Sequence, residues 1–113
     1  MKFSYEDHGS TSVLTVSGEL TADQVDAFRR ACQDRIENGV SHVVLDIEHL
    51  NMIDSAGLEL LLWLIDALAD KGGHLRIVKP DITVRTILEV TRLDRRFDAH
   101  ESIESAAKSI RAL

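Results

Sequence analysis

An apolar strand joined almost directly to an apolar helix constrains the fold of this chain more than any other feature. Residues 43 to 47 are rich in β-branched and aliphatic side chains and predict a buried strand that ends near Asp46. Residues 58 to 68 are equally apolar, and their length favours a helix. Asp54 and Ser55 precede this helix, where side-chain oxygens cap free backbone N–H groups and meet the positive end of the helix dipole. The junction is therefore expected to present a hydroxyl at a helix N-terminus.

The rest of the chain alternates between strand and helix patterns. Two antiparallel strands are expected over residues 3 to 8 and 12 to 18, because the intervening residues suit a turn. The next helix should begin after Thr21, with Thr21 as N-cap and Gln24 completing a capping box. The later segments follow the same alternation: a strand at 74 to 78, a helix capped by Asp81, a short extended piece near 97 to 100 and a helix over 102 to 112.

Apolar stripes on the last two helices predict which side chains reach the core. For the helix after Asp81 these are Ile82, Val84, Ile87, Leu88 and Val90, and for the terminal helix Ile103, Ala106, Ala107 and Ile110. Together the segments run in the order β-β-α-β-α-β-α-(β)-α. This alternation predicts an α/β fold in which a mixed central sheet of about four to five strands carries helices mainly on one face. With 113 residues, one domain spanning residues 1–113 is expected.

Composition narrows the function classes. The chain has 44% hydrophobic and 28% charged residues, as soluble globular proteins do, and its formal net charge of -6 argues against direct binding to nucleic acid. It contains no targeting segment and no apolar run long enough for membrane insertion, so a cytoplasmic location is expected. The single cysteine, Cys32, lies among apolar residues and has no Cys or His at metal-ligand spacing, which predicts a core side chain and no metal site. No cofactor is expected either.

Several motifs resemble those of one known family. The run Leu45-Asp46-Ile47, followed after a spacer by residues 53 to 58, resembles the signature of the STAS domain, specifically of the small bacterial anti-sigma factor antagonists. Gly18-Glu19-Leu20, Pro80, residues 87 to 94 and Phe97 are also similar to that family, so the resemblance covers nearly the whole chain. It implies a STAS-like fold, a mixed sheet with helices largely on one side.

The resemblance also implies a function, which is partner switching. In that scheme the unphosphorylated antagonist binds an anti-sigma factor that is also a serine kinase, and the sigma factor is released. Phosphorylation of the motif serine abolishes the binding, and a PP2C-like phosphatase reverses it. Carried onto this sequence, the phosphoacceptor is Ser55.

The expected partner-binding surface surrounds that serine. It comprises Asp54, Ser55, Ala56, Gly57, Glu59, Thr21 and Asp46. Two roles stay open: Asp46 either orients the site from the strand end or is only solvated there, and Gly57 admits either a neighbouring segment or a partner. Glu59 stands where many family members have glycine, which adds a carboxylate within one turn of Ser55. Thr21 stands where an aspartate is common, which leaves a second hydroxyl as a weaker phosphorylation candidate.

Two other functions compete with partner switching. An enzyme that used Ser55 as a nucleophile would need a base within reach, but the histidines are scattered over turns and strand ends, and no catalytic glycine motif is present. No catalytic residue is therefore predicted. The other rival is a STAS subunit of a phospholipid-transport ABC system, to which the leucine-rich residues 58 to 66 are somewhat similar. In that case the helix would dock an ATPase and Ser55 would not need to be phosphorylated.

Overall fold

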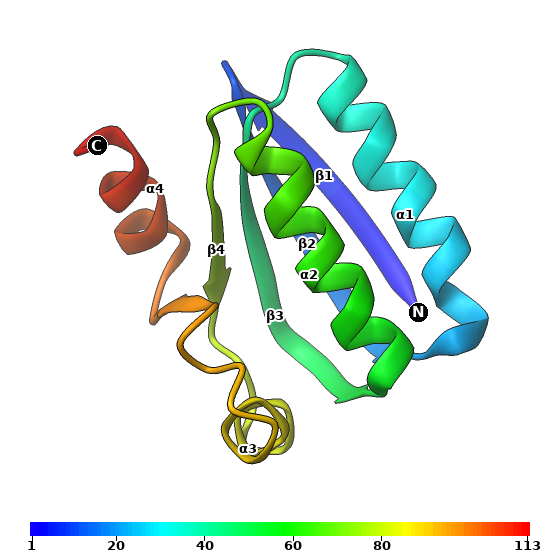
Figure 1. The fold of residues 1–113 in the computed structure, drawn as a ribbon. Coiled ribbons are helices and arrows are strands. Elements are labelled where there is room, and N and C mark those ends of the chain that lie inside the picture. Colours follow the sequence, from blue (N-terminus) through cyan, green and yellow to red (C-terminus); the bar gives the residue numbers. More distant parts are fainter.

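The computed structural model describes residues 1–113, and its elements follow the predicted order (Figure 1). They are β1 (Lys2–His8), β2 (Thr11–Leu20), α1 (Ala22–Glu37), β3 (His42–Ile53), α2 (Ser55–Ala69), β4 (Leu75–Val78), α3 (Ile82–Val90), β5 (Asp98–His100) and α4 (Ile103–Arg111). The five strands form one sheet in the order β1-β2-β3-β4-β5. β1 is antiparallel to β2, and all other neighbours are parallel, so the predicted mixed sheet is confirmed.

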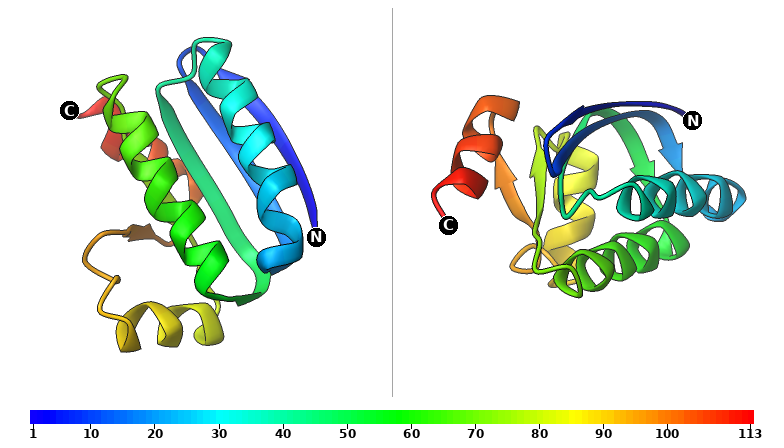
Figure 2. Two further views of the ribbon diagram at one scale, coloured as in Figure 1. Left: turned by 45° about the vertical axis from the view of Figure 1, so that its right-hand side comes forward. Right: turned by 90° about the horizontal axis from the view of Figure 1, so that it is seen from above.

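The helices lie mainly on one face of the sheet, as predicted (Figure 2). A cluster of 21 buried residues joins the sheet to α1, α2 and α3, for example through Phe28, Leu61 and Leu88. Full burial of each such side chain contributes about 1.5–3 kcal/mol. On the opposite face, α4 alone buries Ala106 and Ile110 against Val44 and Val78. The two layers are therefore unequal, and most of the core lies on the side of α1 and α2.

The central strand is longer than the sequence pattern indicated. The predicted end near Asp46 is wrong, because β3 continues to Ile53. Leu50 and Ile53 are buried and pair with the end of β2, where Ile53 lies opposite Leu20. Polar side chains such as Glu48 hide this continuation in the sequence, since they point to solvent from a strand that is covered on one side. Irregularities in the β2–β3 register accompany the extension.

Three of the predicted core side chains are exposed instead. Ile82 and Val90 are 75% and 76% exposed, because in a helix that buries Val84 they project to the far side. In α4, Ile103 is 37% exposed, and Ala107 is only half-buried. Each helix thus buries a stripe narrower than its run of apolar residues suggested.

The structure shows the environment of the single cysteine and the character of the helices. Cys32 is buried in the main core, and burial raises the pKa of its thiol to about 12. The predicted role as a core side chain is confirmed, since such a thiol stays protonated at neutral pH. None of the helices combines the length and the hydropathy that crossing a membrane requires.

Candidate functional site

A single carboxylate joins the N-termini of two helices at one edge of the sheet. Because β2 and β3 are parallel and Leu20 pairs with Ile53, both strands end at this edge, and α1 and α2 begin there. Asp54 is the N-cap of α2, and its Oδ1 accepts a hydrogen bond of 2.9 Å from the N–H of Gly57. Its Oδ2 accepts a second bond of 2.9 Å, from the N–H of Ala22 at the start of α1. Asp54 thus caps both helices.

The electrostatics of Asp54 follow from these bonds. The N–H of Gly57 and then that of Ala22 hold the pKa of the Asp54 carboxyl below its usual range, because both donors stabilise the ionised form. The positive ends of two helix dipoles act in the same direction. Asp54 is therefore a carboxylate at neutral pH, with both oxygens engaged.

The predicted capping box at the start of α1 is wrong. Thr21 occupies the N-cap position, but its side chain forms no capping hydrogen bond. The N–H of Gln24 donates to the backbone carbonyl of Thr21 at 2.8 Å, and the N–H of Ala22 donates to the carboxylate of Asp54. The cap thus comes from 32 residues further along the chain, which a search for local capping motifs cannot detect. Thr21 stays beside the site as a partly buried residue.

Ser55 is the first residue of α2 and is exposed. Its hydroxyl forms no hydrogen bond within the fold, because Asp54 already provides the cap. The sequence pattern predicts a capping role for both Asp54 and Ser55, but only Asp54 caps the helix. The hydroxyl of Ser55 is consequently free at the positive end of the helix, where an anion is favoured.

Gly57 lies in the interior of the molecule. A Cβ atom at this position would lie 2.4 Å from the carbonyl oxygen of Leu20 and 2.7 Å from Cγ1 of Ile53. Both distances are far below van der Waals contact, so only glycine lets the first turn of α2 approach the ends of β2 and β3. Of the two roles left open by the sequence, the structure supports contact with a neighbouring segment of the same chain.

The remaining predicted residues divide into near and distant ones. Glu59 is exposed and follows Ser55 by four residues, so both lie on one face of α2, while Ala56 between them is half-buried. Asp46 is distant: it lies seven residues before the end of β3, roughly 23 Å at about 3.3 Å per residue. Its Oδ1 accepts a bond of 3.1 Å from the N–H of Glu48. The expectation that Asp46 belongs to this site is therefore wrong, because β3 extends past it.

One apolar neighbour of the site was missed. Met52 is 39% exposed two residues before Asp54, within the part of β3 that the sequence pattern indicates as a spacer. Ile53 is buried, and its neighbour Met52 points to the other face of the strand. Simple alternation counted from Ile47 does not reveal this, because Leu50 is also buried where the β2–β3 register is irregular. The exposed surface at this edge therefore includes a hydroxyl, carboxylates and a flexible apolar side chain.

The mixed sheet with its serine at a helix N-terminus is the architecture of a STAS domain, and the chain belongs to the STAS domain family, whose model matches residues 2–106. Among its relatives is the anti-sigma F factor antagonist of Paenibacillus polymyxa, which is 26% identical over 94 residues, covering 82% of this chain and 80% of the relative.

Solved structures agree on the fold. The unphosphorylated anti-sigma factor antagonist SpoIIAA matches with a TM-score of 0.86 at 24% identity, covering 99% of this chain and 98% of SpoIIAA. An anti-sigma factor antagonist of Mycobacterium paratuberculosis matches with a TM-score of 0.85 at 24% identity, covering 97% of this chain and 93% of that protein. The predicted STAS-like fold is thus confirmed.

Proposed function

We propose that this protein is an anti-sigma factor antagonist that works by partner switching. Its unphosphorylated form binds an anti-sigma factor with serine kinase activity, in the cytoplasm, and so frees a sigma factor. Phosphorylation of Ser55 by that kinase ends the binding, and a PP2C-like phosphatase restores it. The observation that carries the proposal is the exposed Ser55 hydroxyl, which has no structural task because Asp54 caps the helix. The names of the relatives support the same role.

The effect of phosphorylation follows from elementary electrostatics. A phosphate adds a charge of about -1.5 to -2 at pH 7, and the N-terminus of α2 tolerates it. Asp54 and Glu59 already place negative charge around Ser55. A partner surface shaped for a neutral hydroxyl would have to desolvate the added dianion next to these carboxylates, at a cost of several kcal/mol, which lowers affinity about a thousandfold or more. The fold is retained while the complex is lost.

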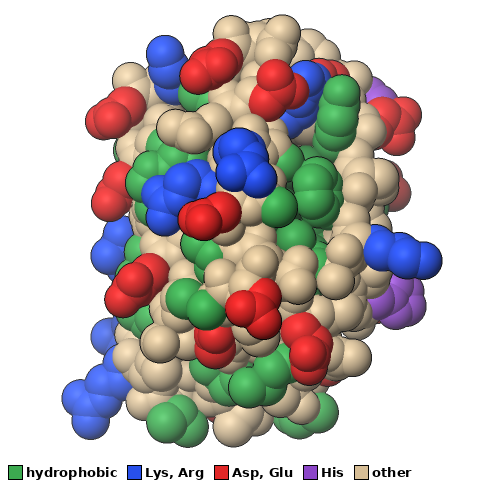
Figure 3. Space-filling model, turned by 90° about the vertical axis from the view of Figure 1, so that its right-hand side faces the viewer, with side chains coloured by type: hydrophobic (Ala, Val, Ile, Leu, Met, Phe, Trp, Pro, Cys, Tyr) green, Lys and Arg blue, Asp and Glu red, His purple; other side chains and the backbone are tan.

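The surface around the site suits a basic partner. The formal net charge is -6, and Figure 3 shows exposed acidic and hydrophobic side chains towards the lower end of the molecule, where α1 begins. Met52 offers an apolar contact next to Asp54. A partner with basic groups around an apolar contact complements these features. Ala56, Glu59 and Thr21 complete the proposed partner-binding surface.

The rival functions gain less support. The relatives are regulatory proteins by name, and the proposed role requires no catalysis by this chain. The relatives described above do not favour a STAS subunit of a phospholipid-transport ABC system. Recovery of an ABC ATPase with the purified protein would support that alternative.

A phosphorylation assay combined with affinity capture tests the proposal. Immobilised protein should recover a kinase-like anti-sigma factor from a lysate of its own species. With that kinase and ATP, mass spectrometry should place one phosphate on Ser55, and Ser55→Ala should abolish the modification whereas Thr21→Ala should not. Modification of Thr21 instead of Ser55 would contradict the assignment.

Binding measurements complete the test. In isothermal titration with the captured partner, Ser55→Asp should bind at least tenfold more weakly than wild type, and Ser55→Ala should still bind. Ser10→Asp is a matched control, because it adds the same charge at an exposed residue of the β1–β2 turn, at the opposite end of β2. Equal affinity of wild type and Ser55→Asp would place the switch elsewhere.

A further inference from the structure

The second face of the sheet is only partly covered. α4 has nine residues and packs on Val44 of β3 and Val78 of β4. A helix is about 10 Å wide and strands are spaced by about 4.8 Å, so α4 covers roughly two of the five strands. A groove remains between α4 and the β1–β2 hairpin. It is distinct from the Ser55 site, which lies at the edge where β2 ends.

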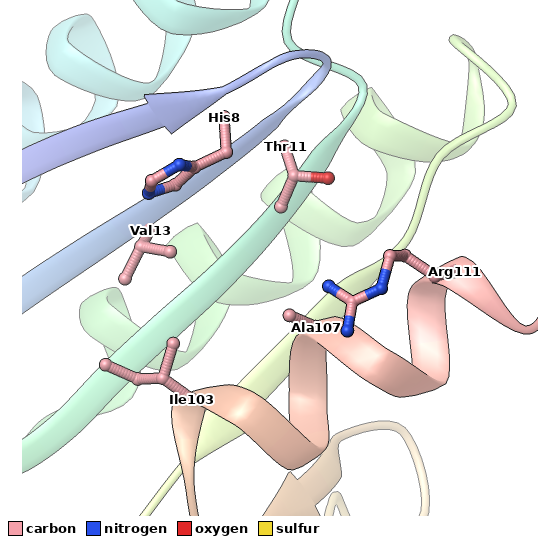
Figure 4. Close-up of a pocket in the computed structure, with 6 residues that line it drawn as sticks. All are labelled: His8, Thr11, Val13, Ile103, Ala107 and Arg111. Atoms are coloured by element: carbon pink, nitrogen blue, oxygen red, sulfur yellow. The ribbon is translucent and has the colours of Figure 1, made fainter.

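This groove is a concave space of about 410 Å³, within the range of small-molecule sites. Six residues line it, and Figure 4 shows their side chains: His8, Thr11, Val13, Ile103, Ala107 and Arg111. We call it the α4 groove. The hairpin contributes half of these residues and α4 the other half, so the groove depends on the two elements being held side by side.

One part of the α4 groove is aliphatic. Val13 forms its floor on β2, and Ile103 and Ala107 form its wall on α4. Val13 also packs against the small buried cluster under α4, so the aliphatic surface of the groove continues that cluster outwards. Ile103 is the side chain that was expected in the core and is 37% exposed here. Ile103 and Ala107 therefore leave apolar surface accessible to solvent in the groove.

The other part of the groove carries hydrogen-bond donors. Arg111 forms no ion pair, although the protein has an excess of acidic residues, and in Figure 4 its guanidinium group extends over Ala107 towards the groove. The imidazole of His8 lies over Val13, and the hydroxyl of Thr11 lies nearby. The carboxylate of Glu6 lies 3.5 Å from Nε2 of His8. An unpaired guanidinium beside an aliphatic surface suits a ligand that is anionic at one end and apolar along its length.

We propose that the α4 groove binds a medium-chain aliphatic carboxylate. The carboxylate group accepts hydrogen bonds from the guanidinium of Arg111 and from the hydroxyl of Thr11. The alkyl chain lies along Val13, Ala107 and Ile103 and removes their apolar surface from water. The site is independent of phosphorylation at Ser55, because it lies on the other face of the sheet from α2.

Titration of octanoate into the ¹⁵N-labelled protein tests this site. Saturable shifts are expected at the amides of Thr11, Val13 and Ala107, with no comparable response to octylamine, which has a similar chain but the opposite charge. Arg111→Gln should weaken octanoate binding roughly tenfold, as expected for loss of a charged hydrogen bond. Arg30→Gln is the matched control, because Arg30 is an exposed arginine on α1. It should bind octanoate like wild type.

Two further variants sharpen the result. Glu6→Gln removes the neighbouring carboxylate and should bind octanoate at least as tightly as wild type, while Ser55→Asp should bind it equally well. The proposal is refuted if octylamine binds as well as octanoate, or if Arg111→Gln leaves the affinity unchanged. It is also refuted if the protein binds only to phosphatidylglycerol vesicles and not to free octanoate.

Discussion

Replacing Gly57 by alanine has two opposing effects on the free energy of unfolding, one from helix propensity and one from packing. In a helix interior, alanine is favoured over glycine by about 1 kcal/mol, so propensity alone predicts that Gly57→Ala stabilises the protein. The added Cβ, however, would lie 2.4 Å from the carbonyl oxygen of Leu20 and 2.7 Å from Cγ1 of Ile53. The carbonyl belongs to the backbone at the end of β2 and cannot rotate away. Overpacking costs about 1–3 kcal/mol, and a contact this short against fixed backbone lies in the upper part of that range, about 2–3 kcal/mol. After the propensity gain of about 1 kcal/mol is subtracted, the net loss is about 1–2 kcal/mol.

Thermal unfolding measures this loss. Unfolding entropy is about 2.1 cal/mol/K per residue, so for 113 residues each kcal/mol corresponds to roughly 4 °C, and Tm should fall by roughly 4–8 °C. Ala56→Gly, in the same helical turn, is the control and should lower stability by about 1 kcal/mol at most through propensity. An unchanged or higher Tm for Gly57→Ala would refute the conclusion that α2 requires glycine at this contact.

Two other predictions concern charge and pH. Asp54→Asn should lower the free energy of unfolding, because its NH₂ group cannot accept a hydrogen bond and would face the N–H of Gly57 or of Ala22. Urea unfolding measures this loss, and a free energy equal to that of wild type would contradict the prediction. Burial and then His74 lower the pKa of His42 below its ordinary value of 6.5, and its Nδ1 accepts the N–H of His74. The stability contributed by neutral His42 is therefore lost as pH falls below 6.5. The free energy of unfolding should decrease less between pH 7.5 and pH 5 for His42→Asn than for wild type, because asparagine keeps an acceptor but cannot be protonated. An equal decrease in both proteins would contradict this role of His42.

The sequence was sufficient for the order of elements because each strand and helix carries its own periodicity. It was insufficient where stability comes from the partner strand. The outer half of β3 contains Glu48 and His49, which look like a loop, yet Leu50 and Ile53 pair with β2 and keep the segment extended. The same error placed Asp46 at the site. Helix faces were overestimated for a related reason, since apolar residues such as Ile82 have no neighbour to pack on.

The site itself was predictable only as a set of neighbours in the sequence. Asp54, Ser55 and Glu59 follow one another closely, so their proximity needed no tertiary information. The bond from Ala22 to Asp54 Oδ2 required knowing that β2 and β3 are parallel and end together. The role of Gly57 likewise depends on Leu20, which is far away in the sequence. Local motifs identified the residues of the site, but the contacts of Asp54 and Gly57 with the end of β2 and the start of α1 depend on the strand register.

Asp54 caps the helix and Ser55 is exposed, so a charge added to Ser55 need not disrupt the fold. If Ser55 were the N-cap, phosphorylation would consume the oxygen that holds the first turn of α2. Instead Asp54 binds Gly57 and Ala22 with its two oxygens, and Ser55 follows it with a free hydroxyl. A phosphate at Ser55 therefore alters the charge and shape of the surface while both helix N-termini keep their cap. A phosphate at Ser55 would therefore change the surface that a partner binds and leave the hydrogen bonds of the fold intact.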